Sequence, residues 1–256
     1  MSLSKESKDF LGNLRIYLIS SGKNEQEVDE IVGELEDHLV ETEKRGKSVS
    51  EVTGLTPRQY MNQISAEMPI DYKSIFEYIV MVLVGAFSFI ILGDALSGDL
   101  SYSVFELIGY PLVMIGFLLC TAAVFKYVSS HPVSKAREWT LFSILGGVPI
   151  LLFMGLFFLG QNVEAPTVVM EGIGRLFALI LAFAAIIAVS LWSKTWIMII
   201  LAILVNGPQL LIQQSSFPEE TKLILTGLSL PVFVGGYFLL LFVKEKKKEK
   251  HAGPVT

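Results

Sequence analysis

The sequence predicts an all-α polytopic membrane protein with six transmembrane helices and a small N-terminal cytosolic helical domain. Its composition is the first reason: of 256 residues, 52% are hydrophobic and only 18% are charged, whereas soluble domains average about 25% charged residues. The second reason is the distribution of charge. Residues 1–69 carry the whole formal net charge of −5, and residues 70–256 carry as many acidic as basic side chains.

The acidic N-terminal segment has the periodicity of a small helical domain. Apolar residues recur every three or four positions over 10–18, and the Ser-Ser-Gly run at 20–22 marks the end of this first helix. Asn24 followed by Glu27 has the form of a second helix start, and Gly46 marks the end of that helix. The apolar stripe of the second helix consists of Val28, Ile31, Val32, Leu35 and Leu39.

Two further helix starts follow in the same segment. Ser48 and Glu51 form a Ser-x-x-Glu box, and Thr56 with Pro57 and Gln59 combines an N-cap, a proline at the first position and an amide at the third. Four short helices in so short a segment make a marginal core on size alone. Docking onto the membrane domain or a partner would therefore add to their stability.

Six apolar runs make up most of the remaining chain, and each has the length of about 20 residues that a transmembrane helix needs. They cover residues 75–96, 104–128, 139–160, 172–192, 195–213 and 222–243. The polar break between the fourth and fifth runs is only Ser193-Lys194-Thr195, and one helix through it would be too long for the bilayer, so we expect a tight turn. The predicted parts are a domain at 1–69, a linker at 70–74, a membrane domain at 75–243 and a basic tail at 244–256.

The positive-inside rule selects one orientation for these spans. With the N-terminal domain in the cytoplasm, the outer segments carry only two basic residues, Arg175 and Lys222. An even number of spans returns the C-terminus to the cytoplasm, so we expect a cell-membrane protein with both termini on that side. The inner basic residues are Lys73, Lys126, Lys135, Arg137, Lys194 and the five lysines from Lys244 to Lys250.

Four short motifs in the first quarter of the chain carry a family resemblance. They are Phe10-Leu11-x-x-Leu14-Arg15-x-x-Leu18, Glu34-Leu35-Glu36-Asp37-His38-Leu39, Gly46-Lys47-Ser48 and Gly54-x-x-Pro57. In these residues the segment resembles the HAAS-type signalling domain, which heads many bacterial multi-pass membrane proteins and is often encoded beside PadR-type transcription regulators. The resemblance implies a cytosolic helical module with a regulatory role, and it brings no catalytic residues. The six spans show no family resemblance.

The sequence contains no pattern that supports catalysis or a cofactor. Cys120 is the one cysteine, which excludes a disulfide framework and a cysteine zinc site. Glu36, Asp37 and His38 are consecutive, and consecutive helical residues point about 100° apart, so they do not converge on a metal ion. No Gly-x-Ser-x-Gly elbow, metalloprotease motif or Walker loop occurs. We therefore expect no enzyme activity, no metal and no cofactor and, because the chain is acidic, no nucleic-acid binding.

The exposed residues of the helical domain are a candidate docking surface for a protein partner, although an acidic helix is most often only a solvated face. The basic tail would lie near anionic lipid headgroups, and the small residues of the spans permit a homo-oligomer. The expected partners are thus membrane lipids, a protein and a second copy of the chain. The candidate docking residues are Glu34, Glu36, Asp37, His38, Glu41 and Arg58.

Polar and helix-breaking positions in the spans are candidates for a transmembrane site. Asn206-Gly207-Pro208 predicts a kink in the fifth span, because proline removes a backbone hydrogen bond and glycine weakens the turn. Glu171 and Arg175 are spaced i,i+4 at the outer start of the fourth span, where they would form an ion pair that ends the helix or an outer gate. Asp94 and Glu106 flank the first outer loop and could approach each other.

These features leave two hypotheses for function. The first is an integral membrane regulatory or signalling protein whose cytosolic domain binds a protein partner, with the six-span bundle as sensor or anchor. The second is a small transporter or transporter subunit in which kinked helices around Asn206 and Pro208 form a substrate path, as discontinuous helices do in transporters. Proline and glycine are also commoner in membrane helices than in soluble ones, so the kinks alone do not decide between the hypotheses.

Overall fold

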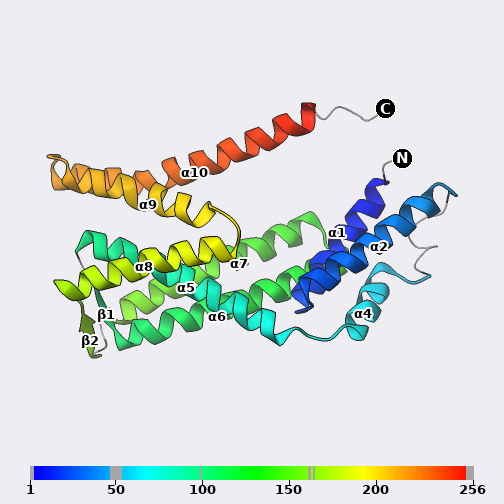
Figure 1. Cartoon of the computed structure of the whole chain (residues 1–256), viewed down its shortest axis with the longest axis horizontal. Helices are drawn as coiled ribbons and strands as arrows, with labels where there is room; N and C mark the ends of the chain where they lie inside the picture. The colour runs from blue at the N-terminus through cyan, green and yellow to red at the C-terminus, as the bar shows by residue number, and fades with distance from the viewer. Residues whose placement is uncertain (1–2, 47–53, 99, 161–162, 164, 252–256) are drawn as a thin grey trace. The chain divides into compact units, whose positions relative to one another are not determined.

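The computed structural model describes residues 3–46, 54–98, 100–160, 163 and 165–251, and most of them are helical (Figure 1). The short helices of the described N-terminal segment are α1 (Lys5–Ser20), α2 (Glu25–Glu43) and α4 (Pro57–Glu67). The long helices are α5 (Tyr72–Ser97), α6 (Val104–Ser130), α7 (Lys135–Gly160), α8 (Ile173–Trp192), α9 (Ile197–Gln214) and α10 (Glu219–His251). Two short strands, β1 (Ser101–Ser103) and β2 (Thr167–Val169), pair with each other.

The six long helices are each long and apolar enough to cross a membrane, which confirms the predicted number of spans within the described part of the chain. The tight turn predicted between the fourth and fifth spans is also present. Lys194 adopts a φ of +52° there, and the Thr195 N–H donates to the Ser190 carbonyl oxygen at 3.1 Å. Helix α10 does not end with its span, because its backbone continues through the basic residues to His251.

Prolines lie inside four of the spans without ending them. Pro111, Pro149, Pro208 and Pro231 are internal residues of α6, α7, α9 and α10. Helix α9 is not interrupted at 206–208, since it is continuous through Pro208, and the kink expected there stays a prediction. One missing backbone hydrogen bond does not end a membrane helix when small local adjustments and neighbouring groups compensate for it.

Helices α2 and α4 begin where the sequence predicts. Asn24 caps α2 with its side-chain oxygen, and Thr56 forms a reciprocal capping box with Gln59 at the start of α4. The predicted start at 48–51 lies outside the described residues. Local cap signals therefore fix the helix starts that the structure describes in this segment.

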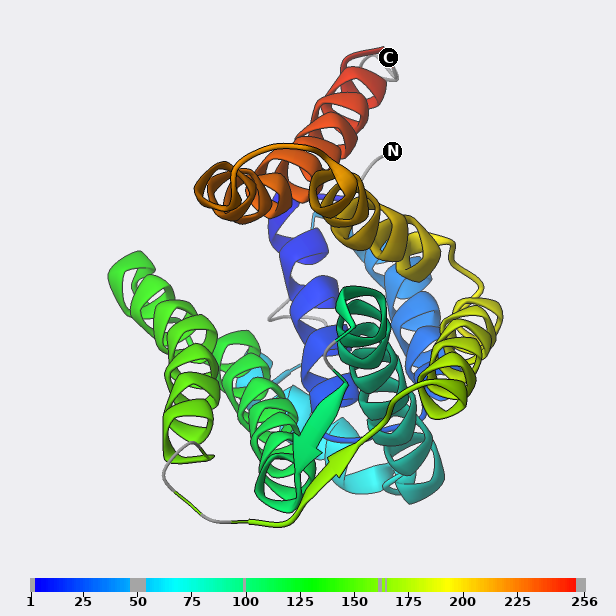
Figure 2. The same ribbon diagram turned by 90° about the vertical axis from the view of Figure 1, so that its left-hand side faces the viewer.

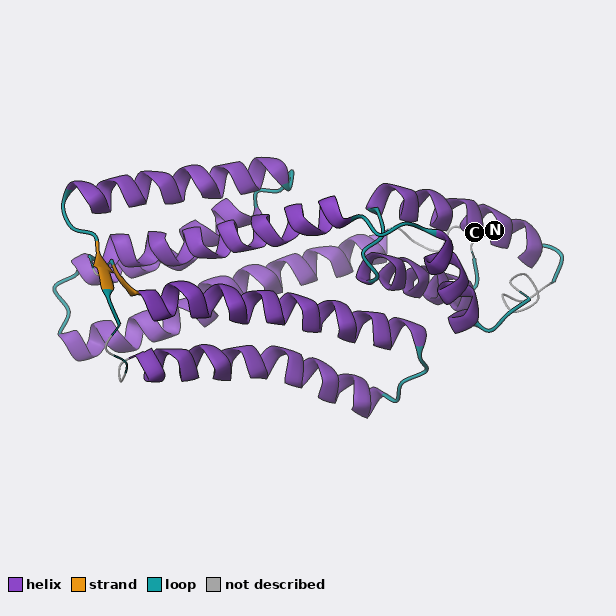
Figure 3. Ribbon diagram, turned by 90° about the horizontal axis from the view of Figure 1, so that it is seen from below, coloured by secondary structure: helices purple, strands orange, loops and turns teal. Residues whose placement is uncertain are grey.

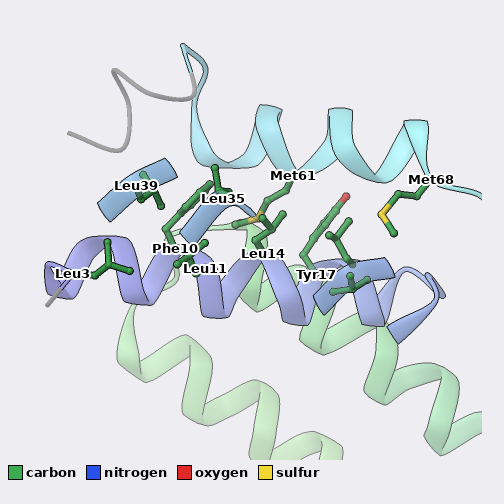
Figure 4. Packing of buried hydrophobic residues seen from close by; sticks show 11 residues of the cluster. Leu3, Phe10, Leu11, Leu14, Tyr17, Leu35, Leu39, Met61 and Met68 are labelled. Carbon is green, nitrogen blue, oxygen red and sulfur yellow. The ribbon is translucent and has the colours of Figure 1, made fainter. Parts of the chain in front are cut away.

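The three short helices share one hydrophobic core (Figure 4). Its most buried side chains, Leu14, Leu18, Val28, Leu39 and Met61, have at most 1% of their surface exposed. Full burial of an aliphatic side chain stabilises a fold by about 1.5–3 kcal/mol, so these contacts hold α1, α2 and α4 together. The other buried members of the cluster are Leu3, Phe10, Leu11, Tyr17, Leu35 and Met68.

The N-terminal helices also pack on the second span. Helix α1 lies along α6, and α4 contacts the same helix. The buried Tyr17 of α1 donates its hydroxyl hydrogen to Asn62 Oδ1 at 2.5 Å, and the Lys126 ammonium of α6 lies 5.3 Å from the Tyr17 ring centroid. A cation at this distance is attracted by the ring. This docking adds to the stability of a core that is marginal on size alone.

By their contacts, the residues fall into two compact units. The first joins Met1–Val80 with Ser103–Pro166, so it holds the N-terminal helices together with α6 and α7. The second joins Met81–Tyr102 with Thr167–Thr256 and holds α8, α9 and α10. This grouping crosses the border predicted at residue 70. That border concerned exposure to water or membrane, which the grouping does not test, and it stays a prediction.

Each unit has its own internal packing. In the first unit, α6 and α7 run side by side. Strand β1, at the border between the two units, leads directly into α6 (Figure 3). In the second unit, α9 and α10 lie side by side (Figure 2). A core of Leu92, Ala182, Ile186 and Ala202 joins the C-terminal part of α5 to α8 and α9. Helix α5 is continuous and contributes residues to both units.

Candidate functional site

The junction between the N-terminal helices and the first span is held by hydrogen bonds centred on Asn24 and Asp71. Asn24 uses both ends of its amide: Oδ1 accepts from the Gln26 N–H at 3.0 Å, and Nδ2 donates to Asp71 Oδ2 at 2.7 Å. The Asp71 carboxylate accepts from the Ser74 N–H at 3.0 Å and from the Ser74 hydroxyl at 2.6 Å. These bonds cap α5. A continuous series of hydrogen bonds therefore connects the start of α2 to the start of α5.

Main-chain contacts reinforce the same junction. The Asp71 N–H donates to the Gly22 carbonyl oxygen at 2.8 Å, and the Lys23 ammonium donates to the Met68 carbonyl oxygen at 2.6 Å. Gly22 has a φ of +75°, and a Cβ atom at this position would lie 2.7 Å from Ile75 Cδ1. Glycine therefore lets the turn between α1 and α2 pack directly against the start of α5.

The Asp71 carboxylate is stabilised in its charged form. Hydrogen bonds from the Ser74 hydroxyl, the Ser74 backbone N–H and the Asn24 amide lower the pKa of Asp71 from 3.8 to about 2. Donors that bond the charged form of a carboxylate favour that form. At neutral pH the Asp71 carboxylate is therefore charged, and in this form it accepts the hydrogen bond from Asn24.

A groove with a volume of about 940 Å³ opens beside this junction. It carries a second side-chain contact between α2 and α5, because the Tyr78 hydroxyl donates to Glu25 Oε2 at 3.0 Å. Arg15 of α1 lies at its edge, 2.9 Å from Asp29 and 3.7 Å from Glu25. The side chains that shape the groove come from the end of α1 and the first turns of α2 and α5, and include Ile19, Glu25, Asp29, Glu30, Ile75 and Tyr78.

The sequence predicts a linker at residues 70–74 and does not predict this junction. A local signal was present, because Asp71 stands three positions before Ser74 and aspartate is among the preferred N-cap residues. The partner of Asp71 could not be found in this way. Asn24 lies 47 positions earlier in the chain, and no local pattern connects the two residues.

The predicted docking residues are all exposed. Arg58 lies on α4, and the others lie on α2 beyond the turns that line the groove. No lysine or arginine occurs between Asn24 and Glu43, so the exposed face of α2 is strongly acidic. Among the described residues, no three His, Cys, Asp or Glu side chains come together in a way that could hold a metal ion. The exposed α2 residues are Glu34, Glu36, Asp37, His38 and Glu41.

Among the predicted polar positions in the spans, Asn206 is the most buried. It is 6% exposed, and its Nδ2 donates to the Ala202 carbonyl oxygen of its own helix at 3.0 Å. Its Oδ1 would lie 3.4 Å from a Cβ atom on Gly93 of α5. Asn206 therefore marks a close approach of α5 and α9, while Pro208 remains inside the continuous helix.

Glu171 and Arg175 do not form the predicted ion pair among the residues that the structure describes. The reason is local: α8 begins only at Ile173, and Gly172 before it has a φ of +54°. The helical spacing on which the prediction rested therefore does not apply to Glu171. The Arg175 guanidinium instead lies against Gly98, 3.2 Å from the place where a Cβ atom would be.

Asp94 and Glu106 are engaged by their own neighbours. The Tyr102 hydroxyl donates to Asp94 Oδ2 at 2.6 Å. Glu106 accepts from the Ser103 N–H at 2.9 Å and from the Ser103 hydroxyl at 2.8 Å, which forms the capping box of α6. Each carboxylate thus has a hydrogen-bond partner close to it in the chain, and the approach of the two stays a prediction.

Residues 89–205 match the family model of the HAAS transmembrane region. The match supports the family link but corrects its location, because the resembling motifs lie in the first quarter of the chain, whereas the match lies in the spans, where no resemblance was expected. No curated protein and no solved structure matches the chain. Together with six apolar helices of spanning length, the match makes the chain a multi-pass membrane protein that is similar to the HAAS transmembrane family from α5 into α9.

Proposed function

We propose that this chain is an integral membrane regulatory protein whose N-terminal domain binds a protein partner and passes the resulting movement to the first span. The observation that carries the proposal is the bond from Asn24 Nδ2 to Asp71 Oδ2, which joins the caps of α2 and α5. A partner that shifts or rotates α2 must strain or break this bond. A flexible linker would transmit no such change, since it could absorb the movement without a change in free energy.

The family match supports a regulatory role for the N-terminal domain. Residues 89–205 are similar to the transmembrane region named for the HAAS family, and the motifs of residues 1–69 resemble the signalling domain of the same family. The two likenesses lie in adjacent parts of one chain. We therefore assign the HAAS-like signalling role to 1–69 and the role of sensor or anchor to the spans.

The distribution of basic residues supports an orientation with both termini in the cytoplasm. Lysine and arginine concentrate in the segments that this orientation places inside, and the lysine-rich end of α10 is among them. The N-terminal domain would then meet a cytosolic partner, and the basic end of α10 would lie near anionic lipid headgroups. The role that we propose needs no catalytic group and no nucleic-acid contact.

The acidic face of α2 is the surface that we propose for the partner, which would present basic side chains. Photo-crosslinking residues placed at Glu36 and Arg58 in living cells would test this, with mass spectrometry to identify the products. We expect one protein to crosslink from both positions. The triple variant Glu34→Lys, Glu36→Lys, Glu41→Lys, probed from Arg58 alone, should lose that product because like charges repel.

A second crosslinking position separates specific docking from general exposure. Asn13 is exposed on α1 and lies outside the proposed surface, so a partner bound to α2 and α4 should react there weakly. Equal yields at Asn13, Glu36 and Arg58, or products formed only within the chain itself, would overturn the proposal of partner binding.

One observation keeps the transporter hypothesis as a second candidate. The Ser190 hydroxyl in α8 is buried without a hydrogen-bond partner among the described residues, and Asn206 is buried in α9 of the same compact unit. Buried polar groups in spans often mark a path for ions or solutes. Proton flux into proteoliposomes that contain pyranine would test this candidate: flux that is lost in both Ser190→Ala and Asn206→Leu supports it, and flux equal to that of empty liposomes opposes it.

A further inference from the structure

We propose that the groove between α1, α2 and α5 is a binding site for a small amphiphilic organic cation, an ammonium group carried on an apolar body. The groove measures about 940 Å³, within the range of about 300–1,000 Å³ typical of small-molecule sites. This inference goes beyond the proposed function, because it assigns a ligand to a place other than the partner surface.

The charge of the groove selects a cation. Four carboxylates line it, and Lys23 is the basic residue of its described lining. The Lys23 ammonium is already held 2.6 Å from the Met68 carbonyl oxygen, and Arg15 at the edge engages Asp29 and Glu25. Glu30 receives its hydrogen bond from the neutral Gln26 amide at 3.2 Å. Negative charge therefore remains in excess, which attracts a cation and repels an anion.

The remaining lining selects an apolar body. Ile19 of α1 is 42% exposed and Tyr78 of α5 is 48% exposed, and both side chains line the groove together with Ile75. Their apolar surface can be removed from water by a hydrocarbon or aromatic group, at about 25 cal/mol for each Å². The Tyr78 ring also offers a surface on which ammonium groups bind.

The groove lies where α2 is joined to α5, so a ligand bound there would affect that junction. Asn24 and Asp71 are both part of the lining, and the bond between their side chains joins α2 to α5. A ligand seated there would touch both sides of the junction. Because it would bind the joined state in preference to a separated one, it should stabilise that state.

The test uses the full chain in phosphatidylcholine nanodiscs, with dansylcadaverine as the probe. This molecule carries an apolar fluorophore and a terminal ammonium, and its emission rises in apolar surroundings. N-pentyl dansylamide, which lacks the ammonium, is the matched neutral compound, and empty nanodiscs give the contribution of lipid partitioning. We expect saturable binding of dansylcadaverine above the empty-disc signal and at least about threefold weaker binding of the neutral compound, since an exposed ion pair contributes little more.

Two variants separate the groove from general acidity. Glu30→Gln removes a lining charge and should weaken dansylcadaverine binding by about threefold, and the double change Glu25→Gln, Glu30→Gln by about tenfold. Glu27→Gln is the control, because Glu27 lies on the same turns of α2, is exposed and does not line the groove. Circular dichroism checks that each variant is folded. Equal binding by the Glu30→Gln and Glu27→Gln variants, or equal binding of the charged and neutral compounds, overturns the proposal.

Discussion

Asn24 and Asp71 join two helix caps through one 2.7 Å hydrogen bond. The Asn24 oxygen caps α2, and the Asp71 carboxylate caps α5, the first span. Each side chain thus caps its own helix, and it could do so without the other. The bond between them is the additional feature, and it connects the start of α2 to the start of α5.

The first prediction separates capping from this bond. Asn24→Asp keeps a good N-cap for α2, removes the Nδ2 donor and places two carboxylates next to each other. We expect faster amide hydrogen exchange in the first turns of α5, with little change in α2, and a melting temperature lower by about 2–4 °C. Hydrogen exchange followed by mass spectrometry measures the first effect, and circular dichroism the second.

The control for this experiment is Asn24→Ala, which removes both the cap and the bond. Exchange should then rise in the first turns of both α2 and α5. If Asn24→Asp leaves exchange in α5 at the level of the unmodified protein, the two caps are independent and the proposed transmission fails.

The second prediction concerns pH. The folded-state pKa of Asp71 is about 2, lowered from 3.8, so its carboxylate stabilises the fold above about pH 4. This contribution is lost as the pH falls from about 4 to about 2, because the unfolded chain then binds the proton more readily than the folded one. The Asp71→Asn variant should melt below the unmodified protein at pH 7, and the gap should shrink between pH 4 and pH 2. A gap that stays constant over this range would contradict the pKa.

The third prediction tests the close packing of Gly22 on α5. Gly22 and Gly46 both have a φ of +75°, but a Cβ atom at Gly22 would meet Ile75 Cδ1 at 2.7 Å, whereas Gly46 has open space. Alanine in this left-handed conformation costs about 1–2 kcal/mol at either site. At Gly22 alone the new Cβ atom would also displace the end of the Ile75 side chain, which adds about 0.5–1.5 kcal/mol if that side chain must leave its preferred rotamer.

Chemical unfolding of Gly22→Ala and Gly46→Ala measures the difference between the two costs. Gly22→Ala should be the less stable variant, and the additional substitution Ile75→Ala should recover part of its loss by making room. Equal free energies of unfolding for the two glycine variants would mean that the turn between α1 and α2 does not rest on α5.

The sequence predicted most of the fold because its signals are local. Spanning length and hydropathy identify the six long helices, and cap residues such as Asn24 and Thr56 identify helix starts. The family likeness in the spans was missed for a related reason. Residues 89–205 are mostly generic apolar side chains, which fit any membrane helix and leave few distinctive positions to compare by eye.

The site was predicted less well because it depends on distant or irregular contacts. The ion pair of Glu171 and Arg175 assumed helical spacing, and the positive φ of Gly172 removes that spacing. Asp94 accepts a hydrogen bond from the Tyr102 hydroxyl, and Asp71 accepts one from the Asn24 amide. Side chains of this kind bond whatever partner the folded chain places nearby, and spacing along the sequence does not reveal that partner.

The last prediction concerns the close approach of α5 and α9 at Gly93. A Cβ atom there would lie 3.4 Å from Asn206 Oδ1, which is an ordinary contact, so Gly93→Ala should be tolerated. The branched side chain of valine extends further and must displace the buried Asn206 amide or separate the helices. We expect Gly93→Val to destabilise the protein by about 1–3 kcal/mol, measured by unfolding in mixed detergent micelles.

Gly116→Val in α6 is the control for this substitution, because Gly116 has no neighbour within 4 Å of its added Cβ atom. It reports any general effect of a β-branched residue in a membrane helix, which should be small. Asn206→Ala should restore part of the stability of Gly93→Val, since the smaller side chain makes room at the crossing. If Gly93→Val and Gly116→Val unfold alike, and Asn206→Ala changes neither, then α5 and α9 do not meet at this point and Asn206 has another role.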